Sequence, residues 1–486
     1  MENINLFKKT KIVCTIGPAS DNMPVLKKLI ENGMNVMRMN FSHGDYAEQH
    51  AKLVLARELE KEDIYIPTML DTKGPEIRCN DMENGKISIK KGQITRISMK
   101  KVLGTPEKIS VTFDKLFDDV SVGNHIKIDD GKLDYEVIDK DEKNREIVCK
   151  ALNDHDISSK KGVNCMGAKL NSLDFISEKD RQDLIWGCEN GVDFISASFV
   201  RCAKDVQDIR DILIAHGHPE IKIISKIENY EAMNCLKEIV DASDGIMVAR
   251  GDLGLEIPEE RVPIVQRQLI NMCRAEGKPV ITATQMLDSM MNSPIPTRAE
   301  VGDVATAITE STDCVMLSGE SANGKYPVES VQMQAKIAHA MEETLDYETL
   351  AKEAYDTSNK DNNDAIANAI ANTAQLIGAK LIVSFTDTGR SSRRISKARP
   401  CCPILSISNK LTTVRQNAVY WGINSVLLKS KRMPEFIEDM EAVSIVHAKN
   451  FGCKPGDTIL ISGGTPTGAG RTNFMRIITI PENKDF

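Results

Sequence analysis

A basic residue and two acidic residues stand at the ends of short apolar runs in the middle of the chain. Lys226 and Glu228 close one run, and Asp252 follows another. Magnesium in proteins takes one or two carboxylates and fills its other positions with water and substrate oxygens, which suits this pair. Either acid alone is explained equally well by a salt bridge to Lys226 or Arg250. Two acids at corresponding positions favour a divalent-metal site.

The residues around Asp252 also have the composition of an anion-binding turn. Arg250, Gly251 and Gly254 flank this acid directly after the apolar run. Glycine lets backbone N–H groups approach a phosphate or carboxylate closely. Two glycines alone are weak support, so the prediction depends on their place after a strand.

The elements that would position these residues alternate along the chain. Short β-branched runs are separated by stretches with apolar residues at helical spacing, which is typical of parallel βαβ units. Eight such units predict a closed (β/α)8 TIM barrel in the α/β class, with its active site at the carboxyl ends of the strands. The predicted strands are 11–17, 35–42, 67–72, 193–199, 222–228, 245–250, 279–285 and 313–319.

Two further regions depart from this alternation. Between Thr72 and Asn164 the apolar residues alternate with period two, which predicts an inserted all-β domain above the barrel mouth. After a polar stretch at 356–363, a new alternation of helix and strand predicts a C-terminal α/β domain. The predicted parts are 1–73 and 165–344 for the barrel, 74–164 for the insertion and 345–486 for the last domain.

Composition limits the partners and the compartment. The 62 basic and 70 acidic residues give a net charge of -8, which offers no overall positive field for nucleic acid. The apolar runs are too short to span a membrane, and the start has no signal-peptide pattern. The twelve cysteines contain no C-x-x-C pair, which argues against a zinc site or a disulfide framework. We therefore expect a cytoplasmic protein that binds neither nucleic acid nor a membrane.

Several long motifs, read in order, closely resemble the pyruvate kinase family. They are the segments 11–20, 37–44, 70–78, 160–164, 225–229, 247–254, 282–287 and 317–321. The resemblance implies phosphoryl transfer from phosphoenolpyruvate to ADP, with pyruvate and ATP as products. It implies that Glu228 and Asp252 hold Mg²⁺, and that Lys226 and Arg38 neutralise the phosphoryl group.

The same resemblance assigns the other side of the substrate. Gly251 and Asp252 would contact phosphoenolpyruvate together with Thr284. This threonine would help to relay a proton to the enolate carbon, as one member of a water chain because its hydroxyl is a poor acid. The alternative for Thr284 is a β-branched residue that only packs at a strand end.

A monovalent cation and the nucleotide are implied in the same way. Oxygen ligands for K⁺ match Asn40, Ser42, Asp71 and Thr72, a set that suits a hard cation. Family members that work without K⁺ typically carry lysine where this chain has Glu76, so we expect K⁺ dependence. The nucleotide-binding residues implied for ADP are Thr15, Pro18, Asn40, His43, Arg78 and Lys161. For Arg78 and Lys161, exposed hinge salt bridges are the alternative.

Two loops of the last domain are candidates for an allosteric phosphate site. They are 386–391 and 463–473, and the second is not a Walker A loop. In the resembling family both places form a sugar-phosphate site, and the matching residues are Thr386, Thr388, Gly389, Arg390, Ser391, Gly468, Gly470 and Thr472. Asp387 departs from bisphosphate-activated members, and its charge would repel a second phosphate. We therefore expect a monophosphorylated sugar or nucleotide effector. The family is commonly tetrameric, which makes a homotetramer the expectation.

Two other functions fit part of the pattern. A Mg²⁺-dependent barrel lyase or mutase that forms pyruvate enolate would need the same carboxylates, but it would not explain Arg78, Lys161 or the insertion. A catalytically silent sensor of sugar phosphate would need only the last domain, and it would not explain Lys226 or Thr284.

Overall fold

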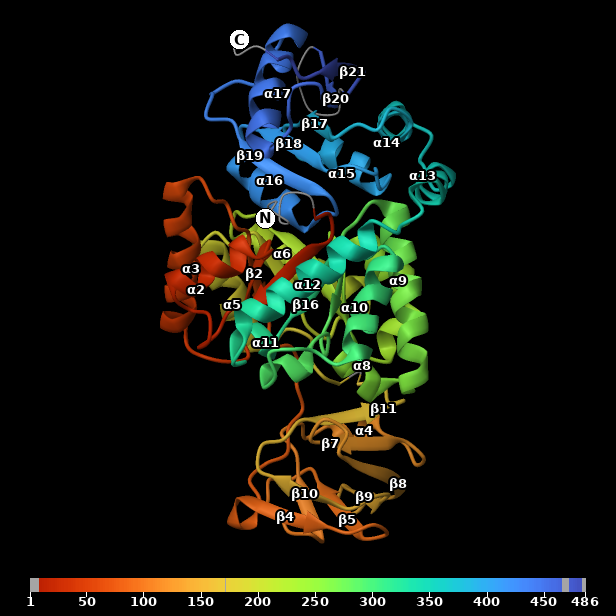
Figure 1. Ribbon diagram of the computed structural model, residues 1–486. Coiled ribbons are helices and arrows are strands. Elements are labelled where there is room, and N and C mark those ends of the chain that lie inside the picture. The colour runs from red at the N-terminus through yellow and green to blue at the C-terminus, as the bar shows by residue number, and fades with distance from the viewer. Residues whose placement is uncertain (1–7, 171, 466–471, 483–486) are drawn as a thin grey trace.

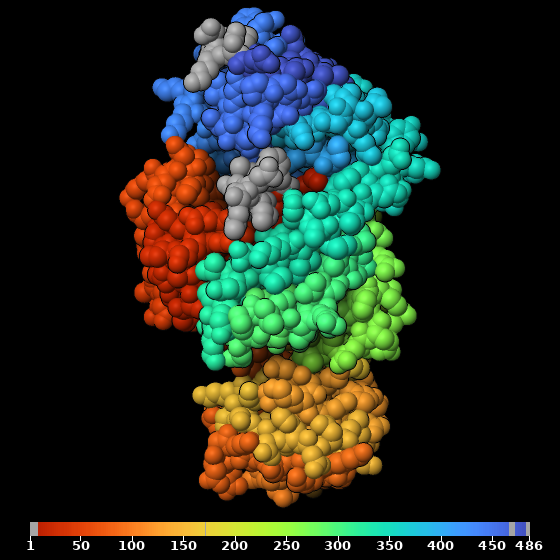
Figure 2. All heavy atoms as spheres, in the orientation of Figure 1, coloured from red at the N-terminus to blue at the C-terminus, as the bar shows by residue number. Residues whose placement is uncertain are grey.

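The computed structural model describes residues 8–170, 172–465 and 472–482. Three parts are stacked along one direction, with the barrel in the middle, the inserted domain at one end and the C-terminal domain at the other (Figure 1). The surface narrows between the barrel and the inserted domain (Figure 2). Both predicted departures from the alternating pattern therefore correspond to separate parts of the molecule.

The middle part confirms the predicted TIM barrel. Its strands are parallel, and β1 pairs with both β2 and β16, which closes the ring. All strands begin and end within three residues of their predicted limits. In sequence order they are β1 (Lys11–Thr15), β2 (Val36–Asn40), β3 (Thr68–Asp71), β12 (Phe194–Ala197), β13 (Lys222–Ile227), β14 (Gly245–Ala249), β15 (Val280–Ala283) and β16 (Cys314–Leu317).

Helices surround this ring, and side-chain caps fix where several of them begin. Ser177 and Asp180 form a capping box that starts α5, and the Asn22 side chain accepts the N–H of Val25 to start α2. The helices of this part are α2 (Met23–Glu31), α3 (Tyr46–Leu59), α5 (Glu178–Glu189), α6 (Ala203–Ala215), α7 (Leu236–Ala242), α8 (Arg250–Glu256), α9 (Val262–Glu276), α10 (Arg298–Thr309), α11 (Gly319–Ala322) and α12 (Pro327–Glu342).

The inserted domain is built mainly from antiparallel pairs around its own apolar core, and only β5 and β6 pair in parallel among its described strands. A two-stranded sheet joins β4 and β10, and a larger sheet has the order β11-β7-β8-β9-β5-β6. Its last strand reaches Met166, so the sheet continues beyond residue 164. The elements are β4 (Lys86–Ile89), β5 (Ile94–Ser98), β6 (Lys108–Ser110), α4 (Leu116–Asp119), β7 (His125–Ile128), β8 (Leu133–Asp141), β9 (Glu146–Ala151), β10 (His155–Ser158) and β11 (Val163–Met166).

The C-terminal domain is a sheet with the order β19-β18-β17-β20-β21 in which β21 runs antiparallel to β20. Apolar residues inside the barrel, such as Val13 and Met316, belong to one cluster with Ile404 and Tyr420 of this domain. The elements are α13 (Tyr347–Asp356), α14 (Asn362–Leu376), β17 (Leu381–Phe385), α15 (Arg390–Lys397), β18 (Ile404–Ser408), α16 (Leu411–Gln416), β19 (Ile423–Leu427), α17 (Ile437–Phe451), β20 (Thr458–Gly463) and β21 (Phe474–Thr479). The shared cluster ties the C-terminal domain to the amino end of the barrel.

Among the described helices, none is both long and apolar enough to cross a membrane.

Candidate active site

A buried cluster of charges occupies the carboxyl end of the barrel. Asp71, the last residue of β3, accepts a hydrogen bond from Nε of Arg38 at 2.8 Å, and its other oxygen lies 3.3 Å from Nζ of Lys226. Burial would raise the pKa of Asp71, but the charges of Arg38 and Lys226 outweigh it and the pKa is lowered. Burial would likewise lower the pKa of Lys226, but Asp71 and Glu228 raise it. The ionised Asp71 carboxylate therefore lies between Arg38 and a Lys226 ammonium that is held charged.

Glu228 is the least satisfied member of this cluster. Its side chain is fully buried, and Oε1 accepts the N–H of Phe199 at 2.7 Å. Oε2 has no hydrogen-bond partner among the described residues and lies 3.2 Å from the ammonium of Lys226. Burial raises the pKa of Glu228 to about 7, and the nearby charge of Asp252 adds to this effect. A cation between the two acids would hold Glu228 ionised.

Asp252 completes a site with few protein ligands. It is the third residue of α8, and burial raises its pKa. In the described part of the chain, no group of three or more histidine, cysteine, aspartate or glutamate side chains is arranged to hold a metal. Two carboxylates leave most of a magnesium shell to water and substrate, so the residues present fit this ion.

Ser198, which was not singled out from the sequence, connects the cluster to β3. Its Oγ accepts a hydrogen bond from Nζ of Lys226 at 2.8 Å and donates one to the carbonyl of Thr72 at 2.6 Å. The residue lies inside the predicted strand 193–199, at the same carboxyl end as the other site residues. A list of the polar residues at the ends of all eight predicted strands would have included Ser198.

The segment after β14 differs from the expected turn. Residues 250–256 form the short helix α8, because Leu253 and Glu256 share one buried face and the N–H of Ile257 closes onto Leu253. Gly251 lies in its first turn and donates its N–H to Oγ1 of Thr284 at 2.8 Å. The structure thus places Gly251 and Thr284 in direct contact.

Thr284 has a strained backbone that Arg250 supports. Its φ is +69°, and that of Gln285 is +54°, in the left-handed region that β-branched residues rarely adopt. The Thr284 carbonyl accepts a hydrogen bond from Arg250 at 2.7 Å, and Arg250 is itself paired with Asp303 at 2.6 Å. The Thr284 hydroxyl donates to the carbonyl of Ala283 at 2.6 Å. Strain of this kind is often kept at functional sites.

The candidate K⁺ ligands lie along the ends of β2 and β3. Oδ1 of Asn40 accepts the N–H of Ser42 at 3.0 Å, and Asp71 and Thr72 follow on the neighbouring strand. Oγ1 of Thr72 accepts the N–H of Ser198 at 3.1 Å. These oxygens therefore lie at the ends of two neighbouring strands, β2 and β3, which also carry the paired side chains of Arg38 and Asp71.

The residues implied for the nucleotide divide between two parts of the molecule. Oγ1 of Thr15 accepts a hydrogen bond from Arg38 at 2.7 Å, inside the charged cluster. Pro18 and His43 are exposed on the barrel, and the N–H of His43 donates to the carbonyl of Asn40 at 3.4 Å.

Arg78 and Lys161 lie on the inserted domain, where both are paired. Arg78 is 2.7 Å from Glu76 and also donates to the carbonyl of Lys160. Lys161 is 2.9 Å from Asp129, and this contact raises the pKa of Lys161. Both side chains are partly exposed, so water weakens these pairs.

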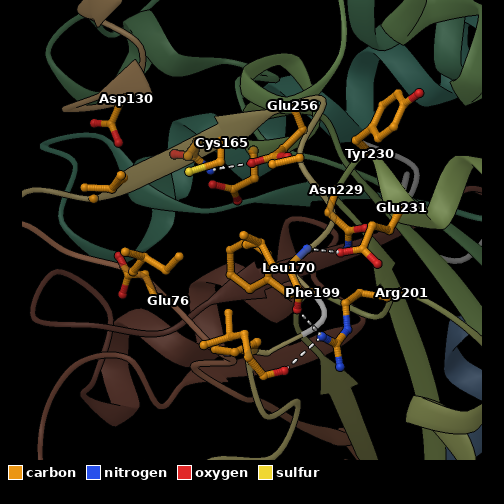
Figure 3. Close-up of a pocket in the computed structure, with 18 residues that line it drawn as sticks. Glu76, Asp130, Cys165, Leu170, Phe199, Arg201, Asn229, Tyr230, Glu231 and Glu256 are labelled. Carbon is orange, nitrogen blue, oxygen red and sulfur yellow. Dashed lines mark hydrogen bonds between the residues drawn. The ribbon is translucent and has the colours of Figure 1, made fainter. Parts of the chain in front are cut away.

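A cleft runs between the inserted domain and the barrel. Figure 3 shows Glu76 and Asp130 on one side of it, with Glu256, Phe199 and Arg201 around the other. Asp252 also lines this cleft, which therefore reaches the candidate metal ligands. Asn164 donates a hydrogen bond to Glu256 at 3.1 Å across the junction.

In the C-terminal domain, the two candidate effector loops meet. The hydroxyls of Ser391 and Thr472 are hydrogen-bonded to each other. Gly389 is the residue directly before α15 and has a φ of +79°, and a side chain there would clash with Asn417. Thr386 is buried, and the Thr388 carbonyl accepts a hydrogen bond from Arg393.

The remaining effector candidates are less constrained. Arg390 is exposed at the start of α15. Asp387, the expected obstacle to a second phosphate, lies 3.6 Å from Lys410. Gly468 and Gly470 lie outside the described residues.

Comparisons with known proteins agree along the whole chain. The family model "Pyruvate kinase, barrel domain" matches residues 7–331, and "Pyruvate kinase, alpha/beta domain" matches residues 364–478. The pyruvate kinase of Geobacillus stearothermophilus is 47% identical over 478 residues, which cover 98% of this chain and 81% of that protein. The enzyme of Staphylococcus saprophyticus is 46% identical, covering 97% and 80%. The crystal structure of a pyruvate kinase from Cryptosporidium parvum superposes with a TM-score of 0.92 at 38% identity, covering 99% of this chain and 97% of that one.

Proposed function

This chain belongs to the pyruvate kinase family and transfers the phosphoryl group of phosphoenolpyruvate to ADP, and we propose that it does so with Mg²⁺ held by Glu228 and Asp252. The observation that carries the proposal is Oε2 of Glu228, a buried carboxylate oxygen with no hydrogen-bond partner in the described structure. When bound, Mg²⁺ would supply a Lewis acid for the phosphoryl and enolate oxygens.

Lys226 and Arg38 provide fixed positive charge for the transferring group. Phosphoryl transfer spreads negative charge over the equatorial oxygens, so catalysis depends mainly on positioning and electrostatic stabilisation. The carboxylate of Asp71 contacts both cations and holds them in place before substrate arrives. Preorganisation of this kind means that little reorganisation is needed when charge develops.

Thr284 would assist protonation of the enolate. Its hydroxyl lies between the N–H of Gly251 and the carbonyl of Ala283. A threonine hydroxyl does not ionise near neutral pH, so we assign it one position in a water chain that delivers the proton. Thr284→Val would remove that position while keeping the shape, and it should slow turnover more than it weakens phosphoenolpyruvate binding.

Potassium would occupy the oxygens at the ends of β2 and β3. We assign its ligands to Asn40, Ser42, Asp71 and Thr72, and we expect K⁺ to help position Arg38. Family members that work without K⁺ typically have a lysine at the position of Glu76, and its positive charge replaces the ion. Glu76 carries no positive charge, which supports a dependence on K⁺.

ADP would bind across the cleft. We assign its contacts on the barrel to Thr15, Pro18, Asn40 and His43. Arg78 and Lys161 of the inserted domain would bind the phosphates of ADP. Each would give up its present ion pair, with Glu76 and Asp129 respectively, and pair with phosphate oxygens instead.

The first experiment measures pyruvate formation from phosphoenolpyruvate and ADP at a fixed Mg²⁺ concentration, with and without K⁺. We expect turnover that needs ADP and Mg²⁺ and rises sharply with K⁺. Turnover indifferent to K⁺ would overturn the K⁺ assignment alone, whereas turnover without Mg²⁺ would overturn the roles of Glu228 and Asp252.

The loops at 386–391 and 463–473 would bind a monophosphorylated sugar or nucleotide. The hydroxyls of Ser391 and Thr472 already meet there, and Asp387 disfavours a second phosphate. Activation at sub-saturating phosphoenolpyruvate by monophosphates, but not by a bisphosphate, is the expected result. By family resemblance we also propose a homotetramer in the cytoplasm, which sedimentation and cell fractionation would test.

A further inference from the structure

Two adjacent thiols lie at the junction between the barrel and the C-terminal domain, far along the chain from the active site. Cys401 and Cys402 stand between Pro400 and Pro403 in the segment that joins α15 to β18. Proline fixes φ at both flanking positions, so the segment has little freedom. The two side chains are close enough for each thiol to change the pKa of the other.

This pair borders a cavity of about 380 Å³ that is open to solvent. All twelve cysteines lie in the described part of the chain, and nine of them are buried. Cys401, Cys202 and Cys235 are the three that are partly exposed. Cys402 is buried, with 5% of its surface exposed. One thiol is therefore accessible and the other is shielded.

The charges that face Cys401 come from four segments. Lys9 belongs to the stretch before β1, and its N–H donates to Glu342 while its ammonium donates to the Tyr347 hydroxyl at 2.7 Å. His339 is paired with Glu343 at 3.4 Å. The titratable and charged residues that line the cavity beside the thiols are Lys9, His339, Glu342, Glu343, Tyr347 and Lys380.

The two thiols titrate differently. The interaction with the Cys402 thiol and the charge of Lys9 lower the pKa of Cys401 to about 7, against the effect of burial. The contact with Cys401, together with burial, raises the pKa of Cys402. An accessible thiolate beside a protonated thiol is the arrangement of a redox-sensitive cysteine and its resolving partner.

We propose that Cys401 is a reversible thiol-modification site that attacks low-molecular-weight disulfides, with Cys402 as the resolving thiol. The Cys401 thiolate attacks one sulfur of the small disulfide, a new S–S bond forms, and the other sulfur leaves as a thiolate. The Cys402 thiol then loses its proton to solvent and attacks Sγ of Cys401, which releases the second small thiolate. Two protein thiols are oxidised, and one small disulfide is reduced to two thiols.

The resulting bond would be readily reversed. Neighbouring Cα atoms are about 3.8 Å apart, whereas most disulfides need at least about 4.4 Å. A strained disulfide has a more oxidising potential and is easily reduced by small thiols. The site is thus suited to a temporary modification.

The test treats the purified full-length protein with glutathione disulfide and locates the products by peptide mass spectrometry. We expect an internal disulfide at Cys401 and Cys402 in the unmodified sequence, and a lasting glutathione adduct on Cys401 in Cys402→Ser. Cys401→Ser should take up no glutathione at this segment. Turnover should be unchanged in both variants, because neither thiol belongs to the catalytic machinery.

Cys235 is the matched internal control, since it is also partly exposed and burial raises its pKa. Allowing for the lower nucleophilicity of a more acidic thiol, Cys401 should react roughly fivefold to tenfold faster near pH 7. Its rate should rise with pH and level off above about pH 8, and Lys9→Gln should move this profile to higher pH. Equal rates at Cys401 and Cys235, or a reaction on Cys401 that Lys9→Gln leaves unmoved in a folded protein, would overturn the proposal.

Discussion

The two ends of the barrel both bury lysine side chains, but they do so in opposite electrostatic conditions. At the carboxyl end, Lys226 lies within 3.3 Å of both Asp71 and Glu228, and its pKa is raised. At the amino end, burial lowers the pKa of Lys8 to about 8 and that of Lys11 to about 7. The difference shows that neighbouring carboxylates, rather than depth alone, decide whether a buried ammonium keeps its charge.

The amino end has a carboxylate, but it is already engaged. Glu342 accepts the N–H groups of Lys9 and Thr10 at 2.8 and 2.6 Å. Lys8 relies on neutral acceptors, the carbonyl of Thr10 and Oδ1 of Asn35. We therefore expect substitutions at the carboxyl end to affect catalysis, and those at the amino end to affect stability.

The largest effect should come from Lys226→Met. Removing one preorganised electrostatic group should lower turnover by roughly 10²-fold to 10³-fold or more. Steady-state kinetics with phosphoenolpyruvate and ADP checks this, with Lys11→Met as the matched control, which should keep turnover within about threefold. A loss below about tenfold in a folded Lys226→Met protein would remove Lys226 from the site.

Glu228→Gln should chiefly change the response to Mg²⁺. Loss of one of two carboxylate ligands should remove about 3 kcal/mol of interaction with the ion, so half-saturation should need roughly 10²-fold more Mg²⁺. A Mg²⁺ titration of turnover measures this shift, and Glu256→Gln, a buried acid outside the cluster, is the control. An unchanged titration would contradict the assignment of Glu228 as a ligand.

Lys11→Met should stabilise the protein at neutral pH. The unfolded chain keeps the Lys11 proton up to about pH 10.5, whereas the folded chain loses it near pH 7. This lysine therefore makes folding less favourable at every pH below about 10.5, and the cost is largest below about pH 7. Replacement should raise the free energy of unfolding by about 1–4 kcal/mol at pH 7. The advantage should shrink as pH rises towards 10, because the unfolded chain then also loses the proton. Urea unfolding at pH 7 and pH 9 gives both values, and a gain that grows with pH would contradict the explanation.

Lys8→Met should have the smallest effect. Its smaller pKa depression means a smaller gain on removal, and the change leaves Asn35 Oδ1 and the Thr10 carbonyl with one donor fewer. These contributions oppose each other, so we expect stability within about 1 kcal/mol of the original protein. The same urea experiment compares the two lysines directly, and a gain as large as that of Lys11→Met would show that the hydrogen bonds of Lys8 contribute nothing.

Much of this architecture was predictable from the sequence, because parallel strands and helices repeat a local pattern. The eight barrel strands and the change to period-two alternation are local signals of this kind. The division of the inserted domain into two sheets is not local, since strands such as β4 and β10 pair across long stretches of chain.

The active-site residues could be predicted from the sequence where they lie at the carboxyl ends of predicted strands. Lys226 and Asp71 were found in this way, and they meet. The role of Ser198 depends on contacts between three strands, which no spacing within one strand reveals. The helix at 250–256 was missed because two glycines in the segment suggested a turn, although its buried residues have helical spacing.

The inserted domain also bears on the order in which the molecule folds. Thr72, which directly follows β3, is hydrogen-bonded to Ser196 of the neighbouring strand β12, and the two residues are 124 positions apart. The domain enters and leaves through adjacent segments, since the N–H of Cys79 donates to the carbonyl of Lys161 and the N–H of Val163 to that of Ile77. If the insertion folds first, it joins these segments and shortens the loop that β3 and β12 must close. Each halving of such a loop lowers the entropic cost by about 0.6 kcal/mol. An insertion that folds early would therefore lower the entropic cost of pairing β3 with β12 and so speed closure of the barrel.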